Sequence, residues 1–337
     1  MKVNYDLFVN TLFMKAQAKG IPLSGSFELT ARCNFDCRMC YIHRRSRDRE
    51  ALMGEKNADW WVNLAKQAKE HGTLLLLLTG GEPLIRKDDI LTLCRENPDC
   101  AFLAYTNATL VDREFCEQMR EVGNLTLALS IEGTEESNDY RRGEGAYART
   151  MAAMKLLREY GLLFGISVCY TSKNIPAVTS DEFIDLMIEN GVRFGLYFNY
   201  MPVGHDAVPE LIPSPEQRVH MYKWLRRMRN SETGKPMFVM DFQNDAEYVG
   251  GGRNYFHINS EGDMEPCVFI HYSDSNIRKN TLIEGLKSPL FQAYYRNQPF
   301  NDNHLRPCPM LENPQCLRKI IADTGARSTD LIAPESA

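Results

Sequence analysis

Hydrophobic and polar positions follow two alternating periods along most of this chain. From residue 26 to residue 200, short β-rich apolar runs are separated by stretches in which apolar residues recur with the period of a helix. This alternation predicts βαβ units that build a parallel sheet. Six strands are expected, at residues 26–30, 73–79, 100–106, 124–131, 162–170 and 192–200. Helices are expected between them, for example at residues 59–71, 112–121, 147–160 and 180–190.

The run from Leu74 to Leu78 is apolar at every position. Strands that are buried on both faces of a parallel sheet have this composition, so we place this run at the centre of the sheet. The repeated βα pattern predicts an α/β fold, namely a partial (β/α)6 barrel of the TIM type. In such barrels the catalytic groups lie just beyond the C-terminal ends of the strands.

Four prolines mark the end of the barrel pattern, at positions 202, 209, 213 and 215. Beyond them the pattern predicts a small α+β extension with helices at 216–230 and 290–296, strands at 237–241, 255–259 and 264–269, and a hairpin turn at 261–263. The predicted organisation is therefore an N-terminal helical segment at 1–24, a core barrel at 25–210, the extension at 211–325 and a frayed tail at 326–337.

Composition and charge narrow the class of protein. The chain has 337 residues, of which 44% are hydrophobic, and its 39 Lys and Arg residues nearly balance its 44 Asp and Glu residues. Nothing in this balance indicates a nucleic-acid or membrane partner, and no apolar run is long enough to span a bilayer. The first residues lack the pattern of a secretory signal, so a cytoplasmic location is expected. In that reducing compartment the ten cysteines are expected to be thiols or metal ligands instead of disulfides.

Three of these cysteines form a candidate metal site. Cys33, Cys37 and Cys40 have the spacing C-x3-C-x2-C and follow the first expected strand, on the face where barrels carry catalytic groups. Three thiolates on one loop can hold three irons of an iron–sulfur cubane and leave the fourth iron open. A zinc site is the alternative, but zinc usually takes paired ligand units, and His43 is the only histidine close by.

This loop resembles the cluster motif of the radical S-adenosylmethionine (SAM) superfamily, C-x3-C-x-aromatic-C. Met39 stands where the aromatic residue is usual, and Tyr41 follows the last cysteine. The resemblance implies a [4Fe-4S] cluster that cleaves SAM reductively to a 5′-deoxyadenosyl radical, which then abstracts hydrogen from a substrate. It also implies an electron donor such as a flavodoxin or a ferredoxin.

A second segment, Gly80, Gly81, Glu82 and Pro83, follows the second expected strand and resembles the GGEP loop of the same superfamily. Two glycines let a backbone approach a ligand closely, and the resemblance implies that Glu82 accepts a hydrogen bond from the ammonium group of SAM. By itself such a segment could be a plain strand-to-helix turn. Its place one βα unit after the cysteine loop favours the functional interpretation.

Further residues resemble SAM contacts of the superfamily. Ser130, at the end of the fourth expected strand, and Arg142, before Gly143, are similar to the serine and arginine that hold the SAM carboxylate and ribose. A guanidinium forks onto a carboxylate, which suits Arg142 to this role. The alternatives are a helix-capping serine and a solvated arginine. Asn107 lies in Thr-Asn-Ala-Thr, which resembles the T-N-G-T stretch of the family.

The expected extension carries a second set of cysteines. The segment from Gly262 to Cys267 matches the G-x4-C element of the SPASM and twitch extensions, which hold auxiliary iron–sulfur clusters, and Cys308 and Cys316 follow it. These extensions normally have a further cysteine before the glycine, and residues 246–252 contain none. The auxiliary site therefore needs a different fourth ligand, or it is degenerate. The other cysteines, at positions 94, 100, 116 and 169, are expected to be small core residues.

The resemblance leaves the substrate open between two classes. SPASM-type extensions often accompany enzymes that modify peptides or proteins, which favours a peptide substrate. Dehydrogenation or epimerisation of a small carbohydrate or alcohol is the alternative within the superfamily. A non-catalytic iron–sulfur or zinc protein that senses redox state or binds a partner is the alternative outside it. The polar residues at 241–248 could supply a base, although a solvated loop is the simpler interpretation.

Overall fold

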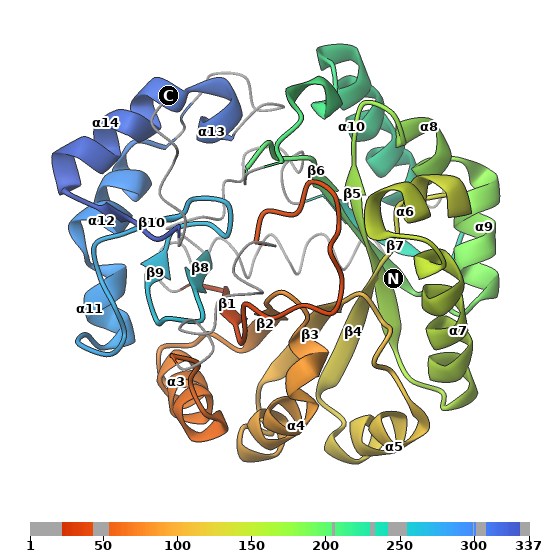
Figure 1. Ribbon diagram of the computed structural model, residues 1–337, viewed down its shortest axis with the longest axis horizontal. Coiled ribbons are helices and arrows are strands. Elements are labelled where there is room, and N and C mark those ends of the chain that lie inside the picture. The colour runs from red at the N-terminus through yellow and green to blue at the C-terminus, as the bar shows by residue number, and fades with distance from the viewer. Residues whose placement is uncertain are drawn as a thin grey trace.

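A curved, mostly parallel sheet organises the molecule (Figure 1). The computed structural model describes residues 22–42, 54–203, 206–229, 233–241, 255–298, 300 and 308–330. Within these residues the main sheet has nine strands in the order β7-β6-β5-β4-β3-β2-β1-β8-β9. Consecutive strands from β1 to β7 are neighbours and pair in parallel, which is the topology of a (β/α) barrel.

The six strands expected from the sequence are all present, each within two residues of its expected bounds. They are β1 (Ser24–Glu28), β2 (Leu75–Thr79), β3 (Ala101–Thr106), β4 (Leu125–Ser130), β5 (Phe164–Tyr170) and β6 (Phe194–Asn199). Leu76 and Leu78 of β2 are fully buried, and β2 lies between β1 and β3. The expectation that the leucine run forms a central strand is therefore confirmed.

Helices cover the outer face of the sheet (Figure 1). They include α3 (Ala58–Glu70), α4 (Lys87–Glu96), α5 (Arg113–Val122), α7 (Ala146–Glu159), α9 (Asp181–Glu189) and α10 (Pro215–Arg229). Several start where a side chain caps the backbone, as Asn57 does for α3, Asp112 for α5 and Ser180 for α9. Two short helices, α6 (Glu135–Arg142) and α8 (Ile175–Val178), follow β4 and β5 directly.

The curvature of the sheet is visible in one aromatic contact on its inner face. Tyr105 of β3 and Phe198 of β6 have ring centroids 5.8 Å apart in an edge-to-face arrangement. Two strands lie between them, so a flat sheet would separate these positions by about 14 Å. The sheet therefore bends around its inner face. Side chains there, such as Ser167 and Cys169, stay partly exposed, whereas their neighbours on the outer face are buried beneath the helices.

Strands from beyond the expected barrel boundary extend this sheet at both ends. β7 (Phe238–Asp241) pairs in parallel with β6, and β8 (Tyr255–Ile258) pairs in parallel with β1. β9 (Met264–Glu265) forms a hairpin with β8. Inside this junction, His257 Nε2 lies 3.7 Å from Glu28 and 3.8 Å from Glu265, with all three side chains buried. The boundary at residue 210 stays a prediction, and the two sides of it share one sheet.

The C-terminal residues form a second, smaller core. It contains Leu290 and Tyr294 of α12 (Pro289–Arg296) and Leu317 and Ile320 of α14 (Pro314–Thr324). The other elements here are β10 (Tyr272–Ser273), α11 (Leu282–Leu286), α13 (Pro309–Glu312) and β11 (Arg327–Ser328). α12 and α14 lie beside α11 at the left of Figure 1. This arrangement agrees with the small α+β extension expected from the sequence.

The expected frayed tail is wrong for its first residues. β11 pairs antiparallel with β10, and the buried Thr329 donates a 2.6 Å hydrogen bond to Glu265. Small and polar residues near a chain end were misread as frayed because this pairing is not visible in the local sequence. Residues 331–337, residues 1–21 of the expected N-terminal helix and residues 242–248 of the polar run lie outside the described residues. No described helix is long and apolar enough to cross a membrane.

Candidate functional site

The cysteine loop follows β1 and lies over the C-terminal ends of the strands (Figure 1). Its backbone is tied to α6, because Arg38 N donates a 2.8 Å hydrogen bond to the carbonyl of Arg141. Met39 has a left-handed backbone (φ 60°) and packs against Tyr200 and Leu211. The residue that replaces the usual aromatic side chain therefore anchors the loop in an apolar cluster.

The three thiols of this loop are partly buried. Burial raises the pKa of Cys33 to about 12 and also raises the pKa values of Cys37 and Cys40. The guanidinium groups of Arg142 and Arg141 oppose this effect at Cys37. A bound cation would favour the thiolates further, since metal ligation deprotonates thiols. Three sulfur donors on a loop beside two arginines therefore fit a metal centre of overall negative charge.

No three His, Cys, Asp or Glu side chains in the described ranges converge as the ligands of one metal ion do. A cubane does not require such convergence, because each thiolate binds a different iron. The donor set, three thiols and no described histidine among them, is the set that iron–sulfur clusters use. The residues present thus fit a [4Fe-4S] cluster.

The two glycines after β2 pack against the start of the cysteine loop. Gly81 N donates a 2.9 Å hydrogen bond to Thr30 O, and Glu82 N donates a 2.8 Å bond to Arg32 O. A Cβ atom at Gly81 would lie 2.2 Å from the Arg32 carbonyl oxygen, and Gly80 has φ +152°. The sequence led us to expect that the glycines approach a ligand. In the structure they approach the backbone that leads into Cys33.

Glu82 is fully buried and accepts three hydrogen bonds. Its donors are the backbone N–H of Leu84 (2.9 Å), the hydroxyl of Thr106 (2.7 Å) and the backbone N–H of Asn107 (2.7 Å). Burial nevertheless raises its pKa to about 7, and these bonds only limit the rise. Glu82 therefore joins β2 to the end of β3. Its expected contact with SAM stays a prediction.

Asn107 connects the end of β3 to the cysteine loop. Its Nδ2 donates a 2.8 Å hydrogen bond to Asn34, which lies between the first two cysteines, and its Oδ1 accepts a 2.6 Å bond from Thr109. Asn34 also donates to Thr109 (2.8 Å). Between these residues, Ala108 has φ +68°, a backbone that favours glycine. This explains in physical terms why the similar family stretch has glycine at that place.

An ion cluster lies at the ends of β4 and β5. Glu132, buried to 1% exposure, binds Arg141 (2.8 Å) and Arg142 through one carboxylate oxygen and the backbone N–H of Cys169 (3.1 Å) through the other. Ser130 ends β4 on the partly exposed inner face. Arg142 is thus held by a carboxylate beside the cysteine loop, with its side chain 13% exposed. It is not the freely solvated arginine of the alternative interpretation.

The expectation that Cys169 is a core residue is wrong. Cys94, Cys100 and Cys116 are buried in the main core, as expected. Cys169 instead lies on the inner face of β5, partly buried, and packs against the cluster that contains Met39. The alternation of side chains along a strand places it there, and the apolar sequence around it does not distinguish the two faces.

Tyr41 joins the cysteine loop to the C-terminal region. Its ring lies 5.2 Å from the ring of Phe269 in an edge-to-face arrangement and 6.2 Å from His271. Burial raises its pKa well above the ordinary value. Since Tyr41 follows Cys40 and Phe269 lies two residues after Cys267, this aromatic contact places the two cysteine segments on either side of one small cluster.

Two of the three C-terminal cysteines, Cys267 and Cys316, pack against the second core, which contains Tyr294. The Tyr294 phenol interacts electrostatically with the thiols of Cys267, Cys308 and Cys316. Cys308 precedes α13, and Cys316 lies in the first turn of α14. Burial raises the pKa of Cys267 to about 12. Cys267 and Cys316 thus lie against one core, and Cys308 lies near enough to Cys267 to affect its pKa.

Sequence reasoning gave no role to three residues of this site. Glu132 lies two residues after Ser130, Asn34 lies within the cysteine loop, and Arg141 directly precedes Arg142. A charged residue directly after a buried strand was the available signal for Glu132. No local signal marked Asn34, because its importance comes from Asn107, which is 73 residues away.

Comparison with known proteins identifies the class. Residues 27–187 match the radical SAM superfamily model. The chain carries a radical SAM domain over these residues and is an enzyme, and the superfamily of this domain uses a [4Fe-4S] cluster and SAM.

Three proteins illustrate its similarities. An AdoMet-dependent heme synthase of Methanosarcina barkeri is 27% identical over 288 residues, which cover 77% of this chain and 80% of that protein. The PqqA peptide cyclase of Granulibacter bethesdensis is 25% identical over 267 residues (73% and 67%). Streptococcus suis SuiB bound to precursor peptide SuiA superposes with a TM-score of 0.69 at 21% identity, covering 88% of this chain and 73% of that one. SuiB is also solved with S-adenosylmethionine.

Gly81 provides a test of the contact between the two loops. We expect Gly81→Ala to destabilise the fold by about 2–3 kcal/mol, because its Cβ would collide with backbone that cannot rotate away. Gly123→Ala is the control, since nothing lies within 4 Å of its Cβ and only its left-handed backbone costs about 1 kcal/mol. Urea unfolding of the cluster-free proteins measures both. Equal destabilisation by the two substitutions would contradict the proposed contact.

The raised pKa of Glu82 predicts a pH-dependent stability. Between about pH 4.5 and about pH 7 the folded protein holds a proton on Glu82 that the unfolded chain has released. The free energy of unfolding should therefore fall as the pH rises through this window, by about 3 kcal/mol, and level off above it. Glu82→Gln should remove this contribution. Urea unfolding of both cluster-free proteins across the window measures it, and parallel profiles would show that Glu82 does not titrate there.

Proposed function

We propose that Cys33, Cys37 and Cys40 hold the [4Fe-4S] cluster and that the protein modifies a peptide by abstracting hydrogen from it. When bound, the cluster and SAM supply the 5′-deoxyadenosyl radical that takes this hydrogen. The observation that carries the proposal is the junction of the cysteine loop with the Gly80–Pro83 segment, where backbone hydrogen bonds join the two.

The protein's own residues would bind and orient SAM around this junction. Arg142 brings a guanidinium close to Cys37, Ser130 offers a hydroxyl from the inner face, and Glu82 brings a buried carboxylate to the end of β2. Asn107 and Tyr41 flank the loop on opposite sides through Asn34 and Phe269. These groups are polar or aromatic and partly or fully shielded from solvent, which strengthens their electrostatic interactions with a charged ligand.

The partly exposed inner face of the sheet is the proposed substrate site. Tyr105 and Phe198 lie there in contact, and Cys169 and Ser167 line the adjacent strand. Solvent must be kept from a reactive radical, and a site enclosed by the sheet achieves this. A peptide is favoured because the precursor-bound SuiB shares the fold and the PqqA peptide cyclase shares a quarter of its sequence.

A tetrapyrrole is the second candidate substrate. It is favoured by the heme synthase of Methanosarcina barkeri, whose similarity extends over 80% of its own length. Titration of the protein with hemin, followed by the Soret absorbance, distinguishes the two substrate classes. Stoichiometric binding with a shifted band would favour the tetrapyrrole. If a short peptide is encoded beside the gene of this protein, a change in its mass after anaerobic incubation with the protein and SAM would favour the peptide.

We further propose that Cys267, Cys308 and Cys316 hold an auxiliary iron–sulfur cluster. Support comes from Cys267 and Cys316, which pack against the second core, and from Cys308, which lies near enough to Cys267 for its charge to raise the pKa of that thiol. The remaining cysteines are buried in the main core or belong to the inner face of β5, so the fourth ligand would be another residue type or the substrate.

The primary site is tested by its cysteines. The Cys33→Ala, Cys37→Ala, Cys40→Ala triple variant should form no 5′-deoxyadenosine from SAM under a strong reductant, because no thiolate remains to hold the irons. Cys94→Ala, in the main core, is the control and should keep this activity. The nucleoside is measured by chromatography. An active triple variant, or an inactive wild-type protein that holds its full iron, would contradict the proposed function.

The auxiliary site is tested by counting irons. Anaerobically reconstituted wild-type protein should contain about eight irons per chain, and the Cys267→Ala, Cys308→Ala double variant about four. Iron and sulfide assays give both numbers, and circular dichroism checks that the variant is folded. About four irons in the wild-type protein would contradict the auxiliary cluster and leave the primary one intact.

A further inference from the structure

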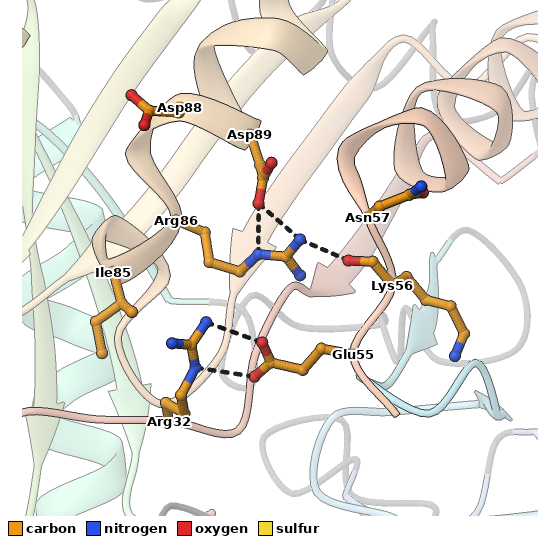
Figure 2. A pocket seen from close by; sticks show the side chains of 8 residues that line it. All are labelled: Arg32, Glu55, Lys56, Asn57, Ile85, Arg86, Asp88 and Asp89. Carbon is orange, nitrogen blue, oxygen red and sulfur yellow. Dashed lines mark hydrogen bonds and ion pairs between the residues drawn. The ribbon is translucent and has the colours of Figure 1, made fainter. Parts of the chain in front are cut away.

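A small charged pocket lies behind the cysteine loop, on the side of α3 and α4 (Figure 2). Its volume is about 380 Å³, and its lining includes Arg32, Glu55, Arg86 and Asp89. Figure 2 shows two ion pairs facing each other across it, Arg32 with Glu55 and Arg86 with Asp89. Neither pair contributes to the SAM contacts proposed above.

Glu55 binds both ends of the turn that leads from β1 into the cysteine loop. Its two carboxylate oxygens accept hydrogen bonds from Arg32 Nε (3.2 Å) and Nη2 (2.9 Å), and one of them also accepts the hydroxyl of Thr30. Within the turn, Arg32 N donates a 3.0 Å bond to the Thr30 hydroxyl. A bidentate contact of this kind fixes orientation as well as distance. Glu55 is 11% exposed, so water competes little for it.

Arg86 holds the residue before this turn. Its guanidinium donates to the carbonyl of Leu29 (2.7 Å) and to the carbonyl of Lys56 (2.5 Å), while Asp89 accepts from its Nε (2.6 Å). The side chain is 8% exposed. Arg86 thereby fixes the end of β1 and, through Lys56, the backbone next to Glu55.

The position of Arg32 matters for both loops of the site. Its carbonyl accepts the Glu82 N–H (2.8 Å), and the next residue is Cys33. A movement of Arg32 would therefore shift a proposed cluster ligand and the Gly80–Pro83 segment together. Arg32 thus carries its charge one residue before a proposed cluster ligand, and Glu55 pairs with that charge.

We propose that Glu55 is a positioning residue that holds Cys33 in place and compensates the charge of Arg32 beside the cluster. This role rests on the proposed cluster site, but part of it can be observed in the cluster-free protein. A partly exposed ion pair by itself stabilises a fold little. A role of Glu55 in overall fold stability alone would leave both the labelling of Cys33 in the folded protein and the cluster potential unchanged.

The first experiment uses the cluster-free protein. Iodoacetamide labelling of Cys33, followed by peptide mass spectrometry, should be about tenfold faster in Glu55→Ala than in wild type, because loss of these bonds lowers the cost of opening the loop. Asp99→Asn is the matched control, since it removes an exposed ion pair with Lys69 far from the loop in sequence. Thermal unfolding shows whether each variant is folded, and Glu55→Gln replaces Glu55→Ala if the latter is not.

The second experiment measures the midpoint potential of the reconstituted cluster without SAM, by EPR-monitored redox titration. Glu55→Gln should raise the potential, because an uncompensated Arg32 charge stabilises the reduced cluster. The Arg32→Gln, Glu55→Gln double variant should return it towards the wild-type value. Unchanged labelling and an unchanged potential in Glu55→Gln would overturn the proposal. A wild-type protein that binds no iron would instead contradict the cluster assignment, and the labelling result would still decide whether Glu55 holds the loop.

Discussion

The site depends on the backbone pairing of β1 and β2 and on its continuation past the ends of both strands. Leu29 N donates to Thr79 O, Gly81 N donates to Thr30 O, and Glu82 N donates to Arg32 O. This ladder brings a loop with three thiols against a loop with two glycines and a buried carboxylate. It is possible only where the second loop has no Cβ, since a Cβ at Gly81 would lie 2.2 Å from the Arg32 oxygen.

Charged side chains on both sides of this ladder form ion pairs with each other. Glu132 binds Arg141 and Arg142 on the side of α6, and Glu55 binds Arg32 on the side of α3. Buried charges are tolerated when they have such partners, and the removal of one partner leaves the other uncompensated. The proposed metal centre would therefore lie between arginines that already have carboxylate partners.

The sequence allowed us to predict features that are encoded locally. The six barrel strands, the leucine-rich central strand and the gathering of Cys33, Cys37 and Cys40 on one loop all follow from short-range pattern and spacing. Pairings between distant segments were not predictable: β8 lies beside β1, with paired residues 231 apart in the chain, and β11 lies beside β10. For the same reason Asn34, Glu55 and Glu132 escaped notice, because the partners that give them a role come from other loops.

The contact between Tyr41 and Phe269 relates the two cysteine segments to the proposed substrate site. Tyr41 directly follows the first segment, and Phe269 belongs to the second. Their ring centroids lie 5.2 Å apart. The pairing of β8 with β1 fixes this contact, because it places the β8–β9 hairpin at the edge of the barrel. A substrate on the inner face would therefore lie beside a primary site that is held rigidly and a C-terminal cysteine set that is fixed through the same sheet.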